Sequence, residues 1–169
     1  MHLPIPVGVG TGSPKCLQVS NDFWRLYFYS FSKEYYQISS AVSRDLVTWE
    51  MEPGFRLEQT GPSESFGIYS PDIIERNGQL YMFYAAWSQK PNMVGIIKVA
   101  TSRDGLAWER LPGTDLTPAM LGKDYVHVSE PKFLDYLDRP MLVFEIADRD
   151  NRWKLAGVNC AFGNSLRNQ

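Results

Sequence analysis

The chain has 169 residues, of which 44% are hydrophobic and 14% aromatic, and this is enough apolar mass for one folded domain with a buried core. The formal net charge is −2, and no two lysine or arginine residues are adjacent. Without a basic patch the chain lacks the electrostatic footprint of a nucleic-acid-binding protein. The composition therefore predicts a folded protein and argues against a nucleic-acid partner.

The N-terminal segment MHLPIPVGVG has neither a basic start nor a continuous apolar stretch. No other run of apolar residues is long enough to span a membrane. We therefore expect a soluble, cytoplasmic protein without an export signal and without a membrane partner.

An internal repeat organises the chain. The segment AVSRDLVTWE, which begins at Ala41, returns as ATSRDGLAWE at Ala100, with six identical positions at an offset of 59. Ser70 and Ser129 are related by the same offset. A period of this length corresponds to about one supersecondary unit. The sequence thus predicts one repeat-built domain with three units, at about residues 12–52, 69–111 and 128–162.

Each unit is predicted to consist of short strands rich in aromatic and β-branched residues. The second unit shows four strands, at residues 70–76, 79–87, 93–101 and 108–111, and Asn77-Gly78 predicts a type I′ turn between the first two. The Ser-Arg-Asp segments form turns before the outermost strands, which gives Asp45 and Asp104 a structural role. In the third unit the last strand covers residues 153–160, and no fourth strand follows.

Four antiparallel strands repeated around an axis make a β-propeller blade, and closed propellers have about four to eight blades. We therefore expect an all-β fold, a partial β-propeller of about three four-stranded antiparallel blades. Trp49 and Trp108 would begin the outermost strands and pack between sheets. An open arc leaves apolar sheet faces exposed, so we expect a homo-oligomer, most simply a dimer that forms a six-bladed pseudo-ring.

Two cysteines, Cys16 and Cys160, lie in strand-like segments of the first and third units. Neither has a second cysteine or a histidine at metal-ligand spacing. We expect two buried thiols, with a disulfide between the first and last units as the alternative.

Two stretches resemble the blades of the five-bladed propeller glycosidases: YSPDIIERNGQLYMFYAA at residues 69–86 and IIKVATSRDGLAWER at residues 96–110. The similarity is to glycoside hydrolase families 43 and 32 and to the related mannoside phosphorylases. It extends to GSPKCL and SEPKFL, which look like innermost strands of such blades. The resemblance implies acidic residues beside a proline at the starts of inner strands, aimed into a central sugar pocket. Hydrolysis uses one carboxyl group to protonate the leaving oxygen and another to activate water or attack carbon.

Three segments anchored by a proline mark the corresponding positions in this chain, and strand alternation would place the residues that flank each proline on one face. The acids of this set, Glu130 and Asp72, are the candidate catalytic residues. The first unit has Ser13 and Lys15 where the family has an acid. The candidate substrate-binding residues are Ser13, Lys15, Tyr69, Ser70, Trp87, His127 and Lys132.

Each candidate also has a structural interpretation. Glu130 could form a salt bridge with Lys132 or Lys15, and Asp72 could accept hydrogen bonds from backbone amides. Four aromatic residues near strand ends could stack on a sugar ring or instead pack between blades: Tyr29, Tyr69, Trp87 and Tyr125.

Two hypotheses on function follow. The first is a glycoside hydrolase that uses carboxylate acid/base chemistry on a carbohydrate ligand. The alternative is a non-catalytic carbohydrate-binding or assembly module on a degenerate propeller scaffold. The sequence shows no phosphate-binding loop and no metal-ligating motif, and its two histidines cannot form a usual zinc site, so we expect no cofactor and no metal.

Overall fold

The part of the chain that the structure describes is all-β apart from two short helical turns. The computed structural model describes residues 3–89, 91, 93–136 and 139–160, and the description below is confined to them. The strands are β1 (Gly10–Ser20), β2 (Phe23–Phe31), β3 (Tyr36–Ser43), β4 (Glu50–Met51), β5 (Gly67–Arg76), β6 (Gln79–Trp87), β7 (Gly95–Ser102), β8 (Glu109–Arg110), β9 (Tyr125–Tyr136), β10 (Arg139–Asp148) and β11 (Trp153–Asn159). The helical turns are η1 (Pro62–Glu64) and α1 (Pro118–Leu121).

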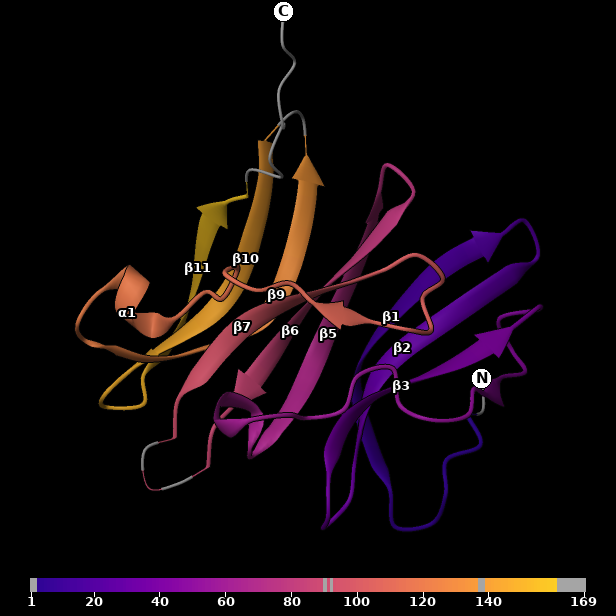
Figure 1. Ribbon diagram of the computed structural model, residues 1–169, viewed down its shortest axis with the longest axis horizontal. Coiled ribbons are helices and arrows are strands. Elements are labelled where there is room, and N and C mark those ends of the chain that lie inside the picture. The colour runs from indigo at the N-terminus through magenta and orange to yellow at the C-terminus, as the bar shows by residue number, and fades with distance from the viewer. Residues whose placement is uncertain (1–2, 90, 92, 137–138, 161–169) are drawn as a thin grey trace, which may run out of the picture.

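The strands form three antiparallel groups that lie side by side, from β1–β3 through β5–β7 to β9–β11 (Figure 1). The first group is a four-stranded sheet in the order β1-β2-β3-β4. The other strands form one larger sheet, in which the second and third groups meet through a single parallel residue pair, Gly95 with His127. This arrangement confirms the predicted propeller-like fold, in which the first strand of each group, β1, β5 or β9, is paired to the second.

The hairpin between β5 and β6 confirms the predicted turn chemistry. Asn77 and Gly78 have φ values of 54° and 72°, as a type I′ turn requires at both central positions. The strand that follows spans Gln79–Trp87, the same residues that the sequence predicted.

The two Ser-Arg-Asp turns are built alike. The Oδ1 atom of Asp45 accepts hydrogen bonds from the backbone N–H groups of Val47 and Thr48, and Asp104 does the same with two following amides. These backbone donors lower the pKa of Asp45 to about 2, with the Thr48 amide as the largest cause. Both aspartates therefore have the structural role that the sequence predicted.

The hydrophobic core lies between the strand groups. One cluster joins the first and second groups through side chains such as Tyr27 and Tyr84, and a second joins the second and third groups through Phe83 and Phe144. A third cluster covers the other face of the first sheet. The predicted packing between sheets is confirmed for Trp108, which packs against the first cluster. It is wrong for Trp49, which lies in the third cluster, on the face of the first sheet that meets no other strand group.

A buried carboxylate that the sequence analysis missed ties the linker before β5 to the second group. Glu64 has no exposed surface, and its carboxylate accepts hydrogen bonds from Tyr84 Oη at 3.0 Å and from Arg110 Nε at 2.9 Å. Lys98 Nζ lies 3.3 Å from the same group. Burial raises the pKa of Glu64, but the hydrogen bonds from Arg110 and Thr60 outweigh it and hold the pKa below its ordinary value.

The cysteines differ from the expectation in one respect. Both are free, so the disulfide alternative is wrong, but Cys16 is exposed and only Cys160 is half-buried. Cys16 lies on β1, the edge strand of the first sheet, which explains its exposure. No helix in the described residues is long and apolar enough to cross a membrane.

Candidate functional site

The inner strands β1, β5 and β9 share one irregularity at their Pro-anchored positions. In β5, Tyr69 and Asp72 are three residues apart but pair with Ala85 and Phe83, which are two apart. The same register shift occurs between Gly12 and Lys15 in β1 and opposite Val143 and Glu145 in β9. Each inner strand therefore carries a β-bulge with one extra residue.

The extra residue breaks the two-residue alternation on which the sequence analysis based a shared face for the residues flanking each proline. The residue before each proline instead has a positive φ: 47° at Ser13, 53° at Ser70 and 49° at Glu130. Positive φ is costly for residues with a side chain, and the α-like regions are further disfavoured before proline. The other non-glycine residues with positive φ in the described part of the chain, Leu46, Asn77 and Asn151, lie outside the strands.

These three strained residues, one from each strand group, converge on one point. Ser70 Oγ donates a hydrogen bond to Glu130 Oε1 at 2.5 Å, and Ser13 Oγ donates to Glu130 Oε2 at 3.5 Å. The two serine hydroxyls lie 3.1 Å apart. We call Ser13, Ser70 and Glu130 the central cluster. Backbone strain of this kind persists where the surrounding structure enforces it, and it concentrates at functional sites.

Glu130 is half-buried and takes no part in the ion pairs found among the described residues. The two salt bridges proposed as its structural role are absent there: Lys15 pairs with another acid, and Lys132 is exposed. Ser13 and Ser70 therefore contact Glu130 as hydrogen-bond donors, whereas the exposed Lys132 is not part of the central cluster.

Asp72 is placed differently. It is 2% exposed, and its Oδ1 atom lies 2.9 Å from Lys15 Nζ. Its Oδ2 atom accepts a hydrogen bond from the backbone N–H of Phe133 at 2.7 Å. Asp72 thus connects β1, β5 and β9 beside the central cluster, and one of its partners is a backbone amide, as its structural interpretation expected.

Two tyrosines and a tryptophan border the central cluster. The ring centroids of Tyr29 and Tyr69 are 5.8 Å apart, and those of Tyr69 and Trp87 are 6.0 Å apart. Burial raises the pKa of both tyrosines, and the negative charge of Glu130 raises it further. Both phenols therefore lie within the field of Glu130.

His127 lies against this border. Its ring stacks on Trp87 with centroids 4.5 Å apart, and its Nδ1 atom accepts a hydrogen bond from the backbone N–H of Gly95 at 3.1 Å. An accepting nitrogen carries no proton, so the neutral ring has its proton on Nε2. Burial lowers the pKa of His127 and favours this neutral form.

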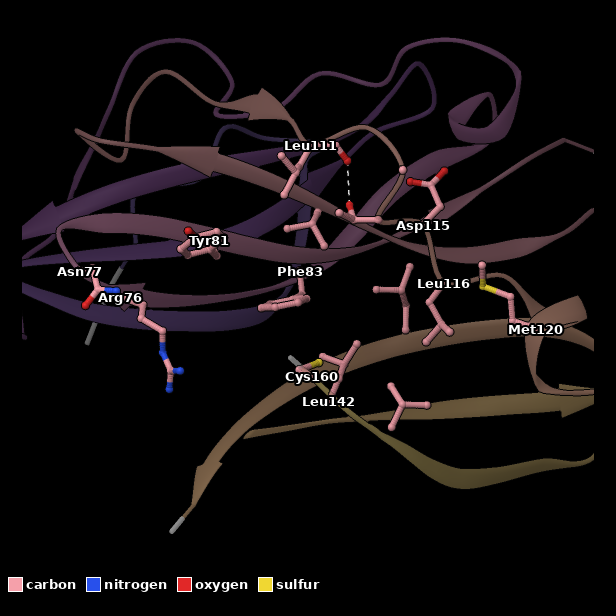
Figure 2. A pocket seen from close by; sticks show the side chains of 15 residues that line it. Arg76, Asn77, Tyr81, Phe83, Leu111, Asp115, Leu116, Met120, Leu142 and Cys160 are labelled. Atoms are coloured by element: carbon pink, nitrogen blue, oxygen red, sulfur yellow. Dashed lines mark hydrogen bonds between the residues drawn. The ribbon is translucent and has the colours of Figure 1, made fainter. Parts of the chain in front are cut away.

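A separate cavity of about 640 Å³ lies between the second and third strand groups. Figure 2 shows the side chains of Phe83 and Leu116 on one side of it and those of Leu142 and Cys160 on the other. Its lining is mainly apolar and contains none of the candidate site residues. The candidate site is therefore the central cluster, and this cavity is separate from it.

Among the described residues, no group of three or more histidine, cysteine, aspartate or glutamate side chains could hold a metal ion. The central cluster offers one carboxylate and two hydroxyls, which suits hydrogen bonding to a polar organic ligand.

Residues 12–155 match the family model for the glycosyl hydrolases family 32 N-terminal domain. The chain belongs to this family. The matched region contains the three strand groups up to the start of β11 and includes the whole central cluster. No curated protein sequence matches the chain.

Solved structures share the fold of this family 32 domain. Sucrose-6-phosphate hydrolase from Lactobacillus gasseri is 15% identical with a TM-score of 0.69, over 90% of this chain and 35% of that one. An α-L-arabinofuranosidase from Lactobacillus brevis is 12% identical with a TM-score of 0.72, over 92% and 54%. A mutant β-fructofuranosidase from Bombyx mori in complex with sucrose is 16% identical with a TM-score of 0.64, over 88% and 32%. The chain thus spans about a third to a half of the length of these proteins.

Sequence reasoning missed part of this site. The bulges were missed, but a signal was present: a proline recurs at the same place in all three inner strands, and proline inside a strand is found mainly at edges and bulges.

Proposed function

We propose that the family 32 domain binds a carbohydrate at the central cluster and that Glu130 is the acid–base group for cleavage of a glycosidic bond. One observation supports this most strongly. Glu130 and the two serines that donate hydrogen bonds to its carboxyl group all have strained backbones, come from three different inner strands, and lie beside Tyr29 and Tyr69. Backbone strain concentrates at functional sites, so its occurrence at all three positions supports a ligand-binding role.

The hydrogen bonds around Glu130 suit proton transfer. Ser70 donates to Oε1 at 2.5 Å and fixes the plane of the carboxyl group, while the contact of Oε2 with Ser13 is 3.5 Å long. Oε2 is therefore the less engaged oxygen and the one that can give a proton to a leaving oxygen or take one from water. Such a general acid or base contributes about 10²- to 10⁴-fold to a reaction rate.

The names of the structural neighbours suggest the class of sugar. They include a sucrose-6-phosphate hydrolase, a β-fructofuranosidase in complex with sucrose and an α-L-arabinofuranosidase. These activities share a five-membered furanose ring as the reacting sugar. We propose a furanoside substrate and take sucrose, β-fructan oligosaccharides and arabinan oligosaccharides as the probes.

Carbohydrate binding without hydrolysis is the second candidate function, and the placement of Asp72 favours it. Hydrolysis uses a pair of carboxyl groups about 5 to 10 Å apart. Asp72 is almost completely buried and is engaged by Lys15 and a backbone amide, so it reaches a substrate only if these contacts open. The binding function requires Glu130 and the aromatic rings alone.

Hydrolysis and binding measurements on Glu130→Gln separate these candidates. If the protein hydrolyses one of the probes, the substitution should lower kcat by about 10²- to 10⁴-fold, with binding changed little. Glu75→Gln, which alters an exposed carboxyl group on β5, is the control and should keep full activity. Binding of a probe without hydrolysis by the wild type would support the second candidate, and neither binding nor hydrolysis would contradict both.

We also propose that the protein self-associates through the outer face of the third strand group. Leu134 and Met141 are register partners on this face, with 49% and 36% of their surfaces exposed. The corresponding outer face of the first sheet is instead packed against Leu3 and Ile5 of the N-terminal segment. This asymmetry supports pairing of two third-group faces and argues against the closed six-bladed ring, which needs the covered face as well.

A further inference from the structure

A row of aromatic rings crosses the end of the sheets at which the central cluster lies. Consecutive centroid distances along the row are 5.4, 6.4, 6.0, 4.5 and 6.0 Å. Its members, in order, are Phe66, Tyr36, Tyr69, Trp87, His127 and Trp153, and we call them the aromatic row. Sequence reasoning found three of the six and missed both ends.

The row follows from where its residues lie in the strands. Tyr36 and Trp153 are the first residues of β3 and β11, Trp87 is the last of β6, and Tyr69 and His127 are the third residues of β5 and β9. The rings are therefore collected from all three strand groups at one end of the strands.

Two glycines allow the rings to lie close against the backbone. A Cβ atom at Gly67 would approach the Tyr36 side chain to 2.5 Å, and one at Gly95 would approach Trp87 to 2.9 Å. Any larger residue at these positions would push the rings away from the sheet. At the far end of the row, Trp87, His127 and Trp153 have nearly parallel planes, with interplanar angles of 9° to 18°.

The aromatic row is not part of the core. None of its six residues belongs to the three hydrophobic clusters, and the two ends are the most accessible, with Phe66 39% and Trp153 41% exposed. A set of partly exposed aromatic rings outside the core is the usual form of a binding surface. Burial within the fold therefore does not explain why the rings are gathered here.

Glu130 lies at the middle of the row. Ser70, the neighbour of Tyr69 in the chain, donates a hydrogen bond to the Glu130 carboxylate, and the charge of Glu130 acts on Tyr69, the third of the six rings. Rings extend from this point in both directions. A single sugar unit or a disaccharide would cover the centre of the row and leave its ends unused. A chain of sugar rings, each with an apolar C–H face, would use all of it.

From this geometry we infer that the aromatic row binds an extended oligosaccharide, which passes over Glu130 and stacks sugar rings on both sides of it. This inference rests on the proposed carbohydrate-binding function and adds to it the length of the ligand. The ends of the row, Phe66 and Trp153, determine the preference for long chains, whereas the central cluster determines whether any sugar binds.

The test is a calorimetric titration of Glu130→Gln, which keeps the ligand intact, with sucrose and with fructan and arabinan hexasaccharides. The hexasaccharide of the bound sugar should bind more tightly than the shortest member of its series. Adding Trp153→Ala or Phe66→Ala should weaken hexasaccharide binding by about five- to tenfold, the loss expected for one stacked ring, and leave short-sugar binding unchanged. Trp153→Phe retains a ring and should restore most of the affinity.

Phe55→Ala is the matched control, because Phe55 is 37% exposed and contacts another aromatic ring, Tyr35, which is not a member of the aromatic row. It should leave all affinities unchanged. A short sugar that binds as tightly as the hexasaccharide, or end variants that weaken both equally, would overturn the extended site while the proposed function stands. If no probe binds and the wild type hydrolyses none, the proposed function fails and this inference fails with it.

Discussion

Ser70 donates its hydroxyl hydrogen to Glu130 Oε1 at 2.5 Å, and both residues hold positive φ directly before a proline. The pair joins β5 and β9 at equivalent positions of the repeat. At each position the positive φ belongs to a β-bulge, and this backbone conformation points the two side chains toward one another. The bulges thus direct polar side chains from the three repeat units to the central cluster.

Ser70→Ala should impair this centre through Glu130. Ser70 is completely buried, so we describe it as a positioning residue that orients the carboxyl group. If the protein hydrolyses a probe, kcat should fall by on the order of 10²-fold, the effect of a small misplacement of a catalytic group, with KM nearly unchanged. Ser39→Ala is the control, because Ser39 is also buried and the hydroxyl contact that it loses is with Ser30 and not with Glu130. Equal kinetic effects of the two substitutions would contradict the positioning role.

Much of the fold could be predicted from the sequence because its signals are local. The Asn77-Gly78 turn, the strand Gln79–Trp87 and the Ser-Arg-Asp turns depend on a few neighbouring residues, and the structure confirms them. The site was only partly predictable. The recurring prolines located Ser13, Ser70 and Glu130, but simple strand alternation could not foresee the bulges that bring these three residues together and separate Lys132 from them.

Other features depend on contacts between distant segments and left no pattern to find. Glu64 lies in a linker with the composition of an exposed turn, yet it is buried, because its carboxylate accepts a hydrogen bond from Arg110, 46 residues further on. Lys15 likewise pairs with Asp72 of the neighbouring strand group, whereas the sequence analysis proposed Glu130 as the partner of Lys15. The ends of the aromatic row were missed because neither Phe66, just before β5, nor Trp153, at the start of β11, belongs to a motif in the sequence.

The buried Glu64 predicts a specific dependence of stability on pH. Because its pKa is lower in the folded protein than its ordinary value of 4.5, its contribution is fully present above pH 4.5 and is lost as the pH falls through the folded-state pKa. Glu64→Gln should destabilise the protein by about 3–5 kcal/mol at pH 7, since it leaves Arg110 and Lys98 without their carboxylate. It should also reduce the acid-induced loss of stability below pH 4.5. Denaturant unfolding at pH 7 and pH 4 measures both effects.

Glu58→Gln serves as the control for this substitution, because Glu58 is an exposed acid in the same linker. It should change stability by less than about 0.5 kcal/mol. A Glu64 variant with an unchanged pH dependence would show that the folded protein does not lower the pKa of this group.

The two Ser-Arg-Asp turns predict a stabilising substitution. Leu46 has a φ of 61°, whereas the equivalent position of the second turn is Gly105, with a φ of 73°. Leu46→Gly should stabilise the protein by about 0.5–1 kcal/mol, because glycine adopts positive φ without strain. That gain corresponds to a rise in Tm of about 1–4 °C. Thermal unfolding followed by circular dichroism is the measurement.

The reverse substitution tests the same argument. In Gly105→Ala, a Cβ atom would lie 2.3 Å from Tyr27 Oη and 2.5 Å from an Arg25 nitrogen, which both donate to backbone carbonyl oxygens of this turn. We expect a loss of about 1–3 kcal/mol, as for overpacking of a buried site. A destabilised Leu46→Gly variant, or an unaffected Gly105→Ala variant, would contradict the strain account.

Self-association predicts a change in mass. Light scattering of the wild type should give the mass of a dimer, and Leu134→Glu should give a monomer, because a charge would replace an apolar contact at the centre of the interface. Glu75→Lys, an exposed change on β5 of the second group, should keep the dimer. A monomeric wild type would contradict the proposed interface and leave the outer face of the third group exposed.

The location of a bound sugar tests the central claim most directly. We would determine a crystal structure of Glu130→Gln with the oligosaccharide that binds most tightly. The account predicts sugar density over the central cluster, with rings stacked on Tyr69 and Trp87 and the chain continuing toward Phe66 and Trp153. Density in the apolar cavity between the second and third strand groups, with an empty central cluster, would contradict it.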